Sequence, residues 1–408
     1  MSGNFIGIVG IVVILAIAFA FSSNRKAINY RVTGAALALQ IVIAAFVLYF
    51  DAGRAAIDTI SSGVLAVIGY SADGINMVFG PLADTNIVGF SFAIKVLPII
   101  IFFSALMSVL YHLRIMEWIV KLVGGALHRI IGTGAIESMN AAANVFVGQT
   151  EAPLVIRPYL KNLTEAQMFA VMVSGLASIA GTVLAGYVLM GAELKYLLAA
   201  AFMAAPGGLL MAKIIMPDDE IVRSGEHEKL VMEPSQHKNV ILAAASGTSD
   251  GLRLAANIGA MLLAFVGLIA LFNGLVGGLF SLVGIDGVTL QFILGKVFQP
   301  LMYLLSVPWE EAEAAGALFG EKLILNEFVA FSHLNDYLAG MSPRTLAITT
   351  FSLCGFANLS SIAILLGGLG VLVPEKRDLI GQLGLKAVLA ASLSNLMSAA
   401  LAGLMLTF

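Results

Sequence analysis

Three consecutive polar residues, Gln149, Thr150 and Glu151, interrupt an apolar part of the chain. They belong to the segment GQTEAP, where Gly148 permits unusual backbone angles and Pro153 keeps the preceding residue out of the helical region. We therefore expect the tip of a hairpin here. A carboxylate and an amide at such a tip can form directed hydrogen bonds to a ligand, and an acid inside a membrane is costly and usually functional. The alternative is a structural Glu151 that pairs with a nearby Arg or Lys.

Two further polar segments are candidates for the same ligand site. LNEFVAF carries Glu327, whose carboxylate can accept hydrogen bonds from two neighbouring hydroxyls, with hairpin packing as the alternative. GFANLSS is predicted to lie within an apolar helix, where Asn358 and Ser361 share one face and Phe356 is nearby for stacking or packing. Such Ser and Asn side chains can instead bond to carbonyls of their own helix. Because neither tip contains Arg or Lys, the pattern favours an uncharged ligand rich in hydroxyls.

The chain contains an internal repeat. Residues 137–151 align without gaps on residues 313–327, and both windows begin and end in Glu. Downstream, SGLASIAG (174–181) aligns with CGFANLSS (354–361) at nearly the same offset. An odd number of membrane spans between the copies would invert the second relative to the first. Inverted repeats with broken helices that meet at the middle of the bilayer are typical of secondary transporters.

The composition is that of a polytopic membrane protein. Hydrophobic residues make up 59% of the 408 and charged residues 12%, whereas soluble domains carry roughly 25% charged residues. The net charge of −3 gives no support for a nucleic-acid partner. Cys354 is the only cysteine, which argues against a disulfide framework or a cysteine-based metal site. The first apolar run (4–21) has no preceding positive charge and is interpreted as a membrane span rather than a cleaved signal.

Apolar runs predict eight membrane spans, because about 20 residues are needed to cross a bilayer. They lie near residues 5–22, 34–50, 88–111, 166–190, 197–216, 256–284, 345–373 and 379–407. Two segments that are too short for two crossings, 136–162 and 309–338, are predicted to be re-entrant hairpins. Segment 54–68 is predicted to lie along the interface, and 217–238 to be a solvated cytoplasmic loop. Helix caps are expected at Thr164 and Ser342.

The elements predict four regions. The first (1–135) holds the N-terminal spans, the interfacial helix and part of a scaffold. The second (136–216) is the first repeat of a transport domain, with one hairpin and spans four and five. The third (217–308) holds the cytoplasmic loop and scaffold span six, and the fourth (309–408) is the second repeat. Basic loops on one side place both termini on the outer side of the membrane.

The motifs GQTEAPL, NEFVA and GFANLSSIAI, in this order, resemble the concentrative nucleoside transporter family in its bacterial, eight-span, sodium-coupled form. The resemblance covers nearly the whole chain. It implies an all-α homotrimer in the bacterial inner membrane, with scaffold and transport domains and both termini periplasmic. It also implies symport of nucleosides such as uridine with sodium as the coupling ion, by an elevator movement rather than by enzymatic chemistry.

The resemblance also assigns roles to individual residues. The residues expected to contact the base are Gln149, Thr150 and Glu151, with Val183 packing beside it, and Phe356 is included in the substrate site. The residues expected to hold the ribose hydroxyls are Glu327, Asn358 and Ser361. The expected sodium ligands are the backbone carbonyls of Asn144, Val147, Ser178 and Ile179, together with the Ser178 hydroxyl.

Three other functions are alternatives. The first is a carrier with the same hairpins but with proton coupling, or with another small polar solute such as a free base or an amino acid. The second is a channel-like or proton-gated pore, which would give flux that does not saturate. The third is an intramembrane enzyme, for which the sequence offers no nucleophile arrangement. The absence of a Walker-type glycine loop disfavours ATP-driven transport.

Overall fold

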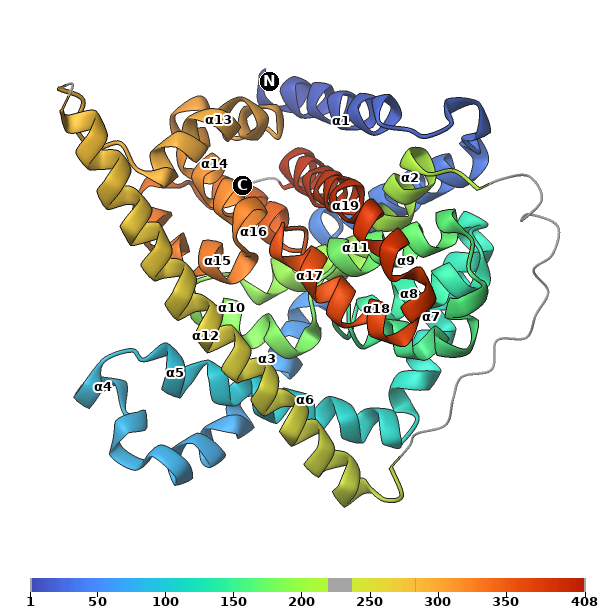
Figure 1. The fold of residues 1–408 in the computed structure, drawn as a ribbon, viewed down its shortest axis with the longest axis horizontal. Coiled ribbons are helices and arrows are strands. Elements are labelled where there is room, and N and C mark those ends of the chain that lie inside the picture. Colours follow the sequence, from blue (N-terminus) through green and yellow to red (C-terminus); the bar gives the residue numbers. More distant parts are fainter. Residues whose placement is uncertain (1, 219–236, 283, 407–408) are drawn as a thin grey trace.

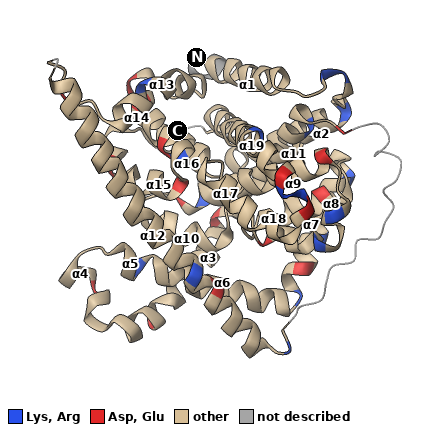
Figure 2. Cartoon of the chain, viewed as in Figure 1, with Lys and Arg blue, Asp and Glu red and all other residues tan. Residues whose placement is uncertain are grey.

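The structure is a computed structural model that describes residues 2–218, 237–282 and 284–406. Every regular element in these ranges is a helix (Figure 1), so the predicted all-helical class is confirmed. Charged residues are sparse along most helices (Figure 2). Of the described helices, seven are long and apolar enough to cross a membrane, or eight if one bent helix pair counts as a single span.

The N-terminal part of the chain forms the helices that precede the first hairpin. After α1 (Ser2–Ala20), α2 (Tyr30–Ala44) continues into a π-helical turn before α3 (Asp51–Phe79). The short α4 (Thr85–Val88) and α5 (Phe92–Lys95) lead into α6 (Leu97–His112), and α7 (Ile115–Ile131) follows. The predicted interfacial segment 54–68 is therefore too short, because the helix continues through Ser and Gly residues to Phe79.

The first predicted hairpin is present as two paired limbs. The helix α8 (Ala135–Asn144) leads to a turn that contains GQTEAP, and the chain returns as a 3₁₀ helix over Ala152–Asn162. Pro153 and Pro158 lie in this returning limb. Because proline has no backbone N–H and clashes with an α-helical turn, it favours the tighter and irregular limb that is observed.

The second hairpin has a shorter turn. It consists of α14 (Trp309–Ile324) and α15 (Glu327–Tyr337), with Leu325 and Asn326 between them. The Asn326 side chain accepts a hydrogen bond from the Val329 N–H at 2.9 Å, which caps α15. Glu327 is therefore the first helical residue after the tip, and its position is set by a regular cap.

Each hairpin is followed by a helix that breaks near its middle. The first pair is α9 (Glu165–Ala177) and α10 (Leu184–Leu189), and the second is α16 (Pro343–Leu353) and α17 (Ser360–Gly367), followed by α18 (Leu369–Leu372). Thr164 and Ser342 cap the starting ends, as predicted. The spans predicted over 166–190 and 345–373 are both interrupted, because the backbone leaves the helical conformation at residues 178–180 and 354–359. Glu165–Leu189 as a whole is nevertheless long and apolar enough to cross a membrane.

Two long helices hold the broken ones together. The helices α11 (Leu194–Ile215) and α19 (Arg377–Met405) pack against each other and against α9 and α16. Figure 1 shows α19 crossing the centre of the molecule. Cys354 lies in the second break and is buried. Both repeats therefore have the same order of elements, namely a hairpin, a broken helix and a long helix.

The helix α12 (Val240–Ser281) runs along one side of the molecule and packs against α6 (Figure 1). Its start precedes the predicted residue 256 because the polar segment GTSDG is helical. Gly247 and Gly251 face α6 so closely that an added Cβ would lie 2.6 Å from the Ser104 carbonyl oxygen and 2.8 Å from Ile101 Cα, respectively. Small residues four apart permit such close packing of membrane helices.

Two helices were not predicted from the sequence. One is α7, and the other is α13 (Leu290–Leu304), which packs along α14. Both mix apolar with charged or amide residues, so neither forms an uninterrupted apolar run. Most of the predicted loop 217–238 lies outside the described residues.

Candidate functional site

The two hairpin tips and the two helix breaks enclose a cavity of about 100 Å³, which α12 closes on one side. All eight residues predicted to contact substrate line it: Gln149, Thr150, Glu151, Val183, Glu327, Phe356, Asn358 and Ser361. They come from four elements that are far apart in the sequence. Their role as ligand contacts stays a prediction, but the fold brings them to one place.

Glu327 is held by two donors. One carboxylate oxygen accepts a hydrogen bond from the Tyr187 hydroxyl at 3.1 Å, and the other accepts one from Asn358 Nδ2 at 3.0 Å. The Glu327 residue is only 3% exposed. Tyr187 is itself fixed by stacking on Phe331, with ring centroids 4.5 Å apart. Each carboxylate oxygen retains a lone pair, so the group is oriented and can still accept hydrogen bonds from a ligand.

Asn358 organises the second break. Its Oδ1 accepts hydrogen bonds from the Ser361 N–H at 2.9 Å and from the Ser360 hydroxyl at 2.7 Å. The prediction that Asn358 and Ser361 share one face of a continuous helix is therefore wrong. The asparagine side chain takes a backbone donor near the start of α17, and this local bond competes with helical bonding through residues 354–359.

Gln149 carries an open acceptor at the first tip. Its Nε2 donates to the Ser361 hydroxyl at 3.4 Å, which connects the first hairpin to α17. Its Oε1 is buried and has no hydrogen-bond partner among the described residues. A buried amide oxygen without a partner is unfavourable, and a ligand donor would satisfy it.

Glu151 lies at a junction between two cavities. It lines the small cavity and also a larger one of about 560 Å³ between the first hairpin and the helices α6 and α12. Small-molecule pockets are typically about 300–1,000 Å³, so the larger cavity has the usual size and the smaller one is narrow. Among the described residues, no ion pair involves Glu151. The structural pairing considered as an alternative for this residue is not observed.

The predicted sodium ligands lie where the first hairpin meets the first break. The Gly181 N–H donates to the Phe146 carbonyl at 3.1 Å, which joins the two segments. The Ser178 hydroxyl bonds to the Gly175 carbonyl at 3.2 Å. In the part of the chain that the structure describes, the carbonyl oxygens of Asn144, Val147 and Ile179 accept no hydrogen bond. The chemistry of this donor set fits a hard cation, which takes oxygen ligands from broken helices.

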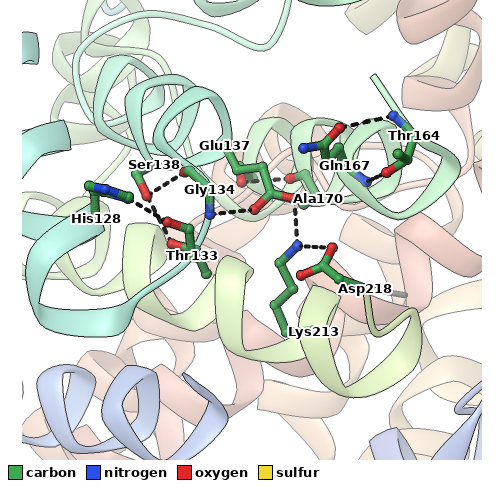
Figure 3. Close-up of polar contacts among 11 residues, drawn as sticks. His128, Thr133, Gly134, Glu137, Ser138, Thr164, Gln167, Ala170, Lys213 and Asp218 are labelled. Atoms are coloured by element: carbon green, nitrogen blue, oxygen red, sulfur yellow. Dashed lines mark hydrogen bonds and ion pairs between the residues drawn. The ribbon is translucent and has the colours of Figure 1, made fainter. Parts of the chain in front are cut away.

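A buried ion cluster fixes the base of the first hairpin (Figure 3). Lys213 Nζ lies 2.5 Å from a Glu137 carboxylate oxygen and 2.6 Å from one of Asp218. The other Glu137 oxygen accepts from the Gly134 N–H at 3.2 Å, which caps α8. Lys213 and Glu137 are 3% and 1% exposed. The cluster ties α8 to α11 away from the cavity.

Several residues in or next to the site were not predicted from the sequence. Tyr187, which holds Glu327, belongs to an apolar stretch with no distinguishing signal. The α12 residues Leu254, Ile258 and Met261 also line the cavity, and their side chains resemble those that face lipid. Asn326 and Ser360 lie next to predicted residues, and the polar motifs around them were the signal that could have identified them.

The comparisons with known proteins agree across the chain. Family models described as "Na+ dependent nucleoside transporter" match residues 9–82 (N-terminus) and 196–403 (C-terminus), and one described as "Nucleoside recognition" matches 93–194. A nucleoside permease of Helicobacter pylori is 51% identical over 407 residues, with 97% of this chain and 96% of that protein covered. A sodium/nucleoside cotransporter of Mus musculus is 36% identical and covers 97% of this chain, which spans 63% of that protein.

Solved structures of similar chains give the same fold. The transporter CNTnw in an inward-facing, substrate-bound state is 48% identical, covers 99% of this chain and 98% of its own, and has a TM-score of 0.93. A variant of CNTnw in an outward-facing state, also 48% identical, has a TM-score of 0.95 over 99% of this chain and 98% of its own. The membrane-embedded helical architecture is therefore shared with known transporters.

Proposed function

This chain belongs to the sodium-dependent nucleoside transporter family, and from that premise we propose that it imports nucleosides such as uridine together with sodium. The observation that carries this proposal is the oriented carboxylate of Glu327, held by Tyr187 and Asn358 inside a cavity. An oriented carboxylate can accept two hydrogen bonds from vicinal hydroxyls, and the ribose of a nucleoside presents such a pair.

In this proposal, the two tips contact different parts of the nucleoside. Glu327, Asn358 and Ser361 bind the ribose hydroxyls. Gln149, Thr150 and Glu151 contact the base, with Val183 and Phe356 packing against it. The unpartnered Gln149 oxygen supports this assignment, because the edge of a nucleobase carries N–H donors. Neither tip has a cationic residue, which suits an uncharged ligand.

Sodium binds, in this proposal, between the first tip and the first break. The carbonyls of Asn144, Val147, Ser178 and Ile179 and the Ser178 hydroxyl are its ligands. One cation moving down about 100 mV contributes roughly 2.3 kcal/mol, and a tenfold sodium gradient adds about 1.4 kcal/mol. Together they support accumulation of a neutral solute on the order of several hundredfold.

The larger assembly is part of the same proposal. The two repeats form a transport domain that moves as an elevator against a scaffold containing α6 and α12. Three chains associate as a homotrimer in the bacterial inner membrane, with both termini periplasmic. The tight glycine contact between α6 and α12 supports a rigid scaffold. The large cavity between these helices and the first hairpin supports movement of the hairpin relative to them.

The test is uptake of labelled uridine into proteoliposomes, with sodium or potassium outside and equal pH on both sides. Saturable, concentrative uptake that needs sodium is expected. Uptake that ignores sodium and follows an acid-outside gradient would replace the ion assignment by proton coupling. No uptake of uridine or adenosine under either gradient would contradict the nucleoside assignment.

A further inference from the structure

The two helix breaks are joined to each other by a backbone hydrogen bond. The Phe356 N–H donates a hydrogen bond to the Ser178 carbonyl at 3.1 Å, so a residue of the second break bonds to a residue of the first. The Asn358 N–H in turn donates to the Phe356 carbonyl at 2.9 Å, and Asn358 Nδ2 donates to Glu327 at 3.0 Å. A continuous chain of bonds therefore runs from the proposed ion site to the proposed ribose site.

A buried asparagine on α19 clamps the same two breaks. Asn395 Nδ2 donates to the Ala177 carbonyl at 2.7 Å and to the Cys354 carbonyl at 2.7 Å. Ala177 is the last residue of α9, and Cys354 follows the last residue of α16. One amide group thus satisfies a carbonyl at the open end of each broken helix. A Cβ added at Gly355 would lie 2.7 Å from this Nδ2, so the backbone there approaches as closely as glycine permits.

Lys322 fixes the orientation of this amide. Its Nζ donates to Asn395 Oδ1 at 2.8 Å and to the Ser352 carbonyl at 3.2 Å. Lys322 is fully buried in α14, and no carboxylate of the described residues forms an ion pair with it. An ammonium can only donate and carbonyls can only accept, so the Asn395 amide has one orientation that satisfies all its partners.

We propose that Asn395 and Lys322 are positioning residues that couple the sodium site to the ribose site. This inference rests on the proposed function. Sodium that draws the Ser178 carbonyl into its coordination shell fixes the first break. The clamp and the Phe356 bond then fix the second break, and with it Asn358 and Glu327. Neither Asn395 nor Lys322 lines the cavity, so neither touches the nucleoside.

This coupling has a signature that direct contact at the first tip does not produce. Sodium should strengthen the hydrogen bonds to the ribose hydroxyls, and not only those to the base. The measured quantity is the hydroxyl gain, defined as the dissociation constant of 2′,3′-dideoxyuridine divided by that of uridine. Isothermal titration of the detergent-purified protein gives this gain in sodium and in potassium. In the unsubstituted protein we expect the gain to be about tenfold larger in sodium, within the usual range of coupling between sites.

Two variants test the residues themselves. Asn395→Asp keeps the side-chain shape and the contact to Lys322 but cannot donate to the two carbonyls, so the sodium-dependent part of the hydroxyl gain should fall to about one. Lys322→Met should reduce it severalfold, because the amide loses its fixed orientation. The matched control is Ser398→Ala, one turn away on α19, which removes the buried bond from Gln40 Nε2 at 3.0 Å and should leave the coupling unchanged.

The outcomes separate the two levels of the proposal. A hydroxyl gain that is equal in sodium and potassium in the unsubstituted protein overturns the coupling, and this measurement does not depend on any variant folding. Full retention of sodium-dependent gain in folded Asn395→Asp also overturns it. Equal loss in Ser398→Ala would assign the effect to general destabilisation of α19 and reject a specific clamp. If uridine binds in neither salt, it is the proposed function that fails.

Discussion

The two hairpins carry equivalent glutamates in opposite environments. In the first hairpin the base residue, Glu137, is buried against Lys213, whereas the tip residue, Glu151, is exposed to two cavities. In the second hairpin the base residue, Glu313, pairs with Lys296 at the surface, whereas the tip residue, Glu327, is buried and held by two donors.

Under the proposed function, this difference between the hairpins corresponds to a division of tasks between the repeats. A fixed base with an open tip suits a hairpin that adapts to different nucleobases and to an ion beside it. A fixed tip suits recognition of a part that all nucleosides share, the ribose. The repeat places glutamates at the same two positions of each hairpin, and the surroundings of these glutamates differ.

The largest expected effect on stability concerns the base residues of the two hairpins, Glu137 and Glu313. Lys213→Met leaves Glu137 and Asp218 without their cation and should lower the free energy of unfolding by about 3–5 kcal/mol, as for other broken buried pairs. Lys296→Met, which removes the α13 cation paired with Glu313 of the second hairpin, should cost about 0–1 kcal/mol because the Lys296 side chain is 50% exposed. Chemical denaturation in detergent measures both. Equal losses of unfolding free energy in the two variants would remove the contrast between the base residues of the two hairpins.

The next effect concerns the fixed tip. Glu327→Gln should weaken uridine binding on the order of a hundredfold, because two hydrogen bonds to a charged acceptor are replaced by weaker ones. Tyr187→Phe, which removes only one donor to this carboxylate, should cost about fivefold. Titration calorimetry with uridine provides the values. An unchanged affinity in Glu327→Gln would refute the ribose assignment.

The open tip should respond less. Glu151→Gln keeps an acceptor and the side-chain length, so we expect a loss of about tenfold for uridine. The loss should differ between uridine and adenosine, since this residue is proposed to contact the base. Glu327→Gln serves as the comparison, because its loss should be similar for both nucleosides. The reverse pattern would exchange the roles of the two tips.

The smallest effect concerns the ion beside the first tip. Ser178→Ala removes one proposed hydroxyl ligand and leaves the carbonyls, so the sodium concentration for half-maximal uptake should rise severalfold. Uptake at saturating sodium should stay near its original value. A sodium curve identical to that of the unsubstituted protein would argue against a hydroxyl ligand. Ser361→Ala is the control, since it should change uridine affinity instead.

The tips were predictable from the sequence because glycine, proline and adjacent polar residues act locally. The segment GQTEAP and the Asn326–Glu327 pair each predict a turn that carries a charged residue within an apolar chain. The helix break at residues 354–359 was not predicted from local signals, because the bond between Asn358 and the Ser361 N–H becomes decisive only when the neighbouring elements accept the freed backbone groups.

The remaining site residues depend on tertiary contacts. Tyr187 meets Glu327 across 140 positions of sequence, and Asn395 meets Ala177 across 218. Nothing in an apolar stretch marks which tyrosine faces a carboxylate and which faces lipid. For the same reason, the α12 wall of the cavity was not predicted, since apolar side chains that pack on protein and those that pack on lipid are alike in composition.

Because Cys354 is buried, the reactivity of its thiol reports on opening of the structure around it. It is the only thiol in 408 residues, and it is 2% exposed in the second break, whose Cys354 carbonyl shares the Asn395 amide with the end of α9. A maleimide can react with this thiol only when the contact between the two breaks opens, so the rate of labelling measures how often the two breaks separate. The motion at the centre of the protein can therefore be timed without introducing a cysteine or removing a native one.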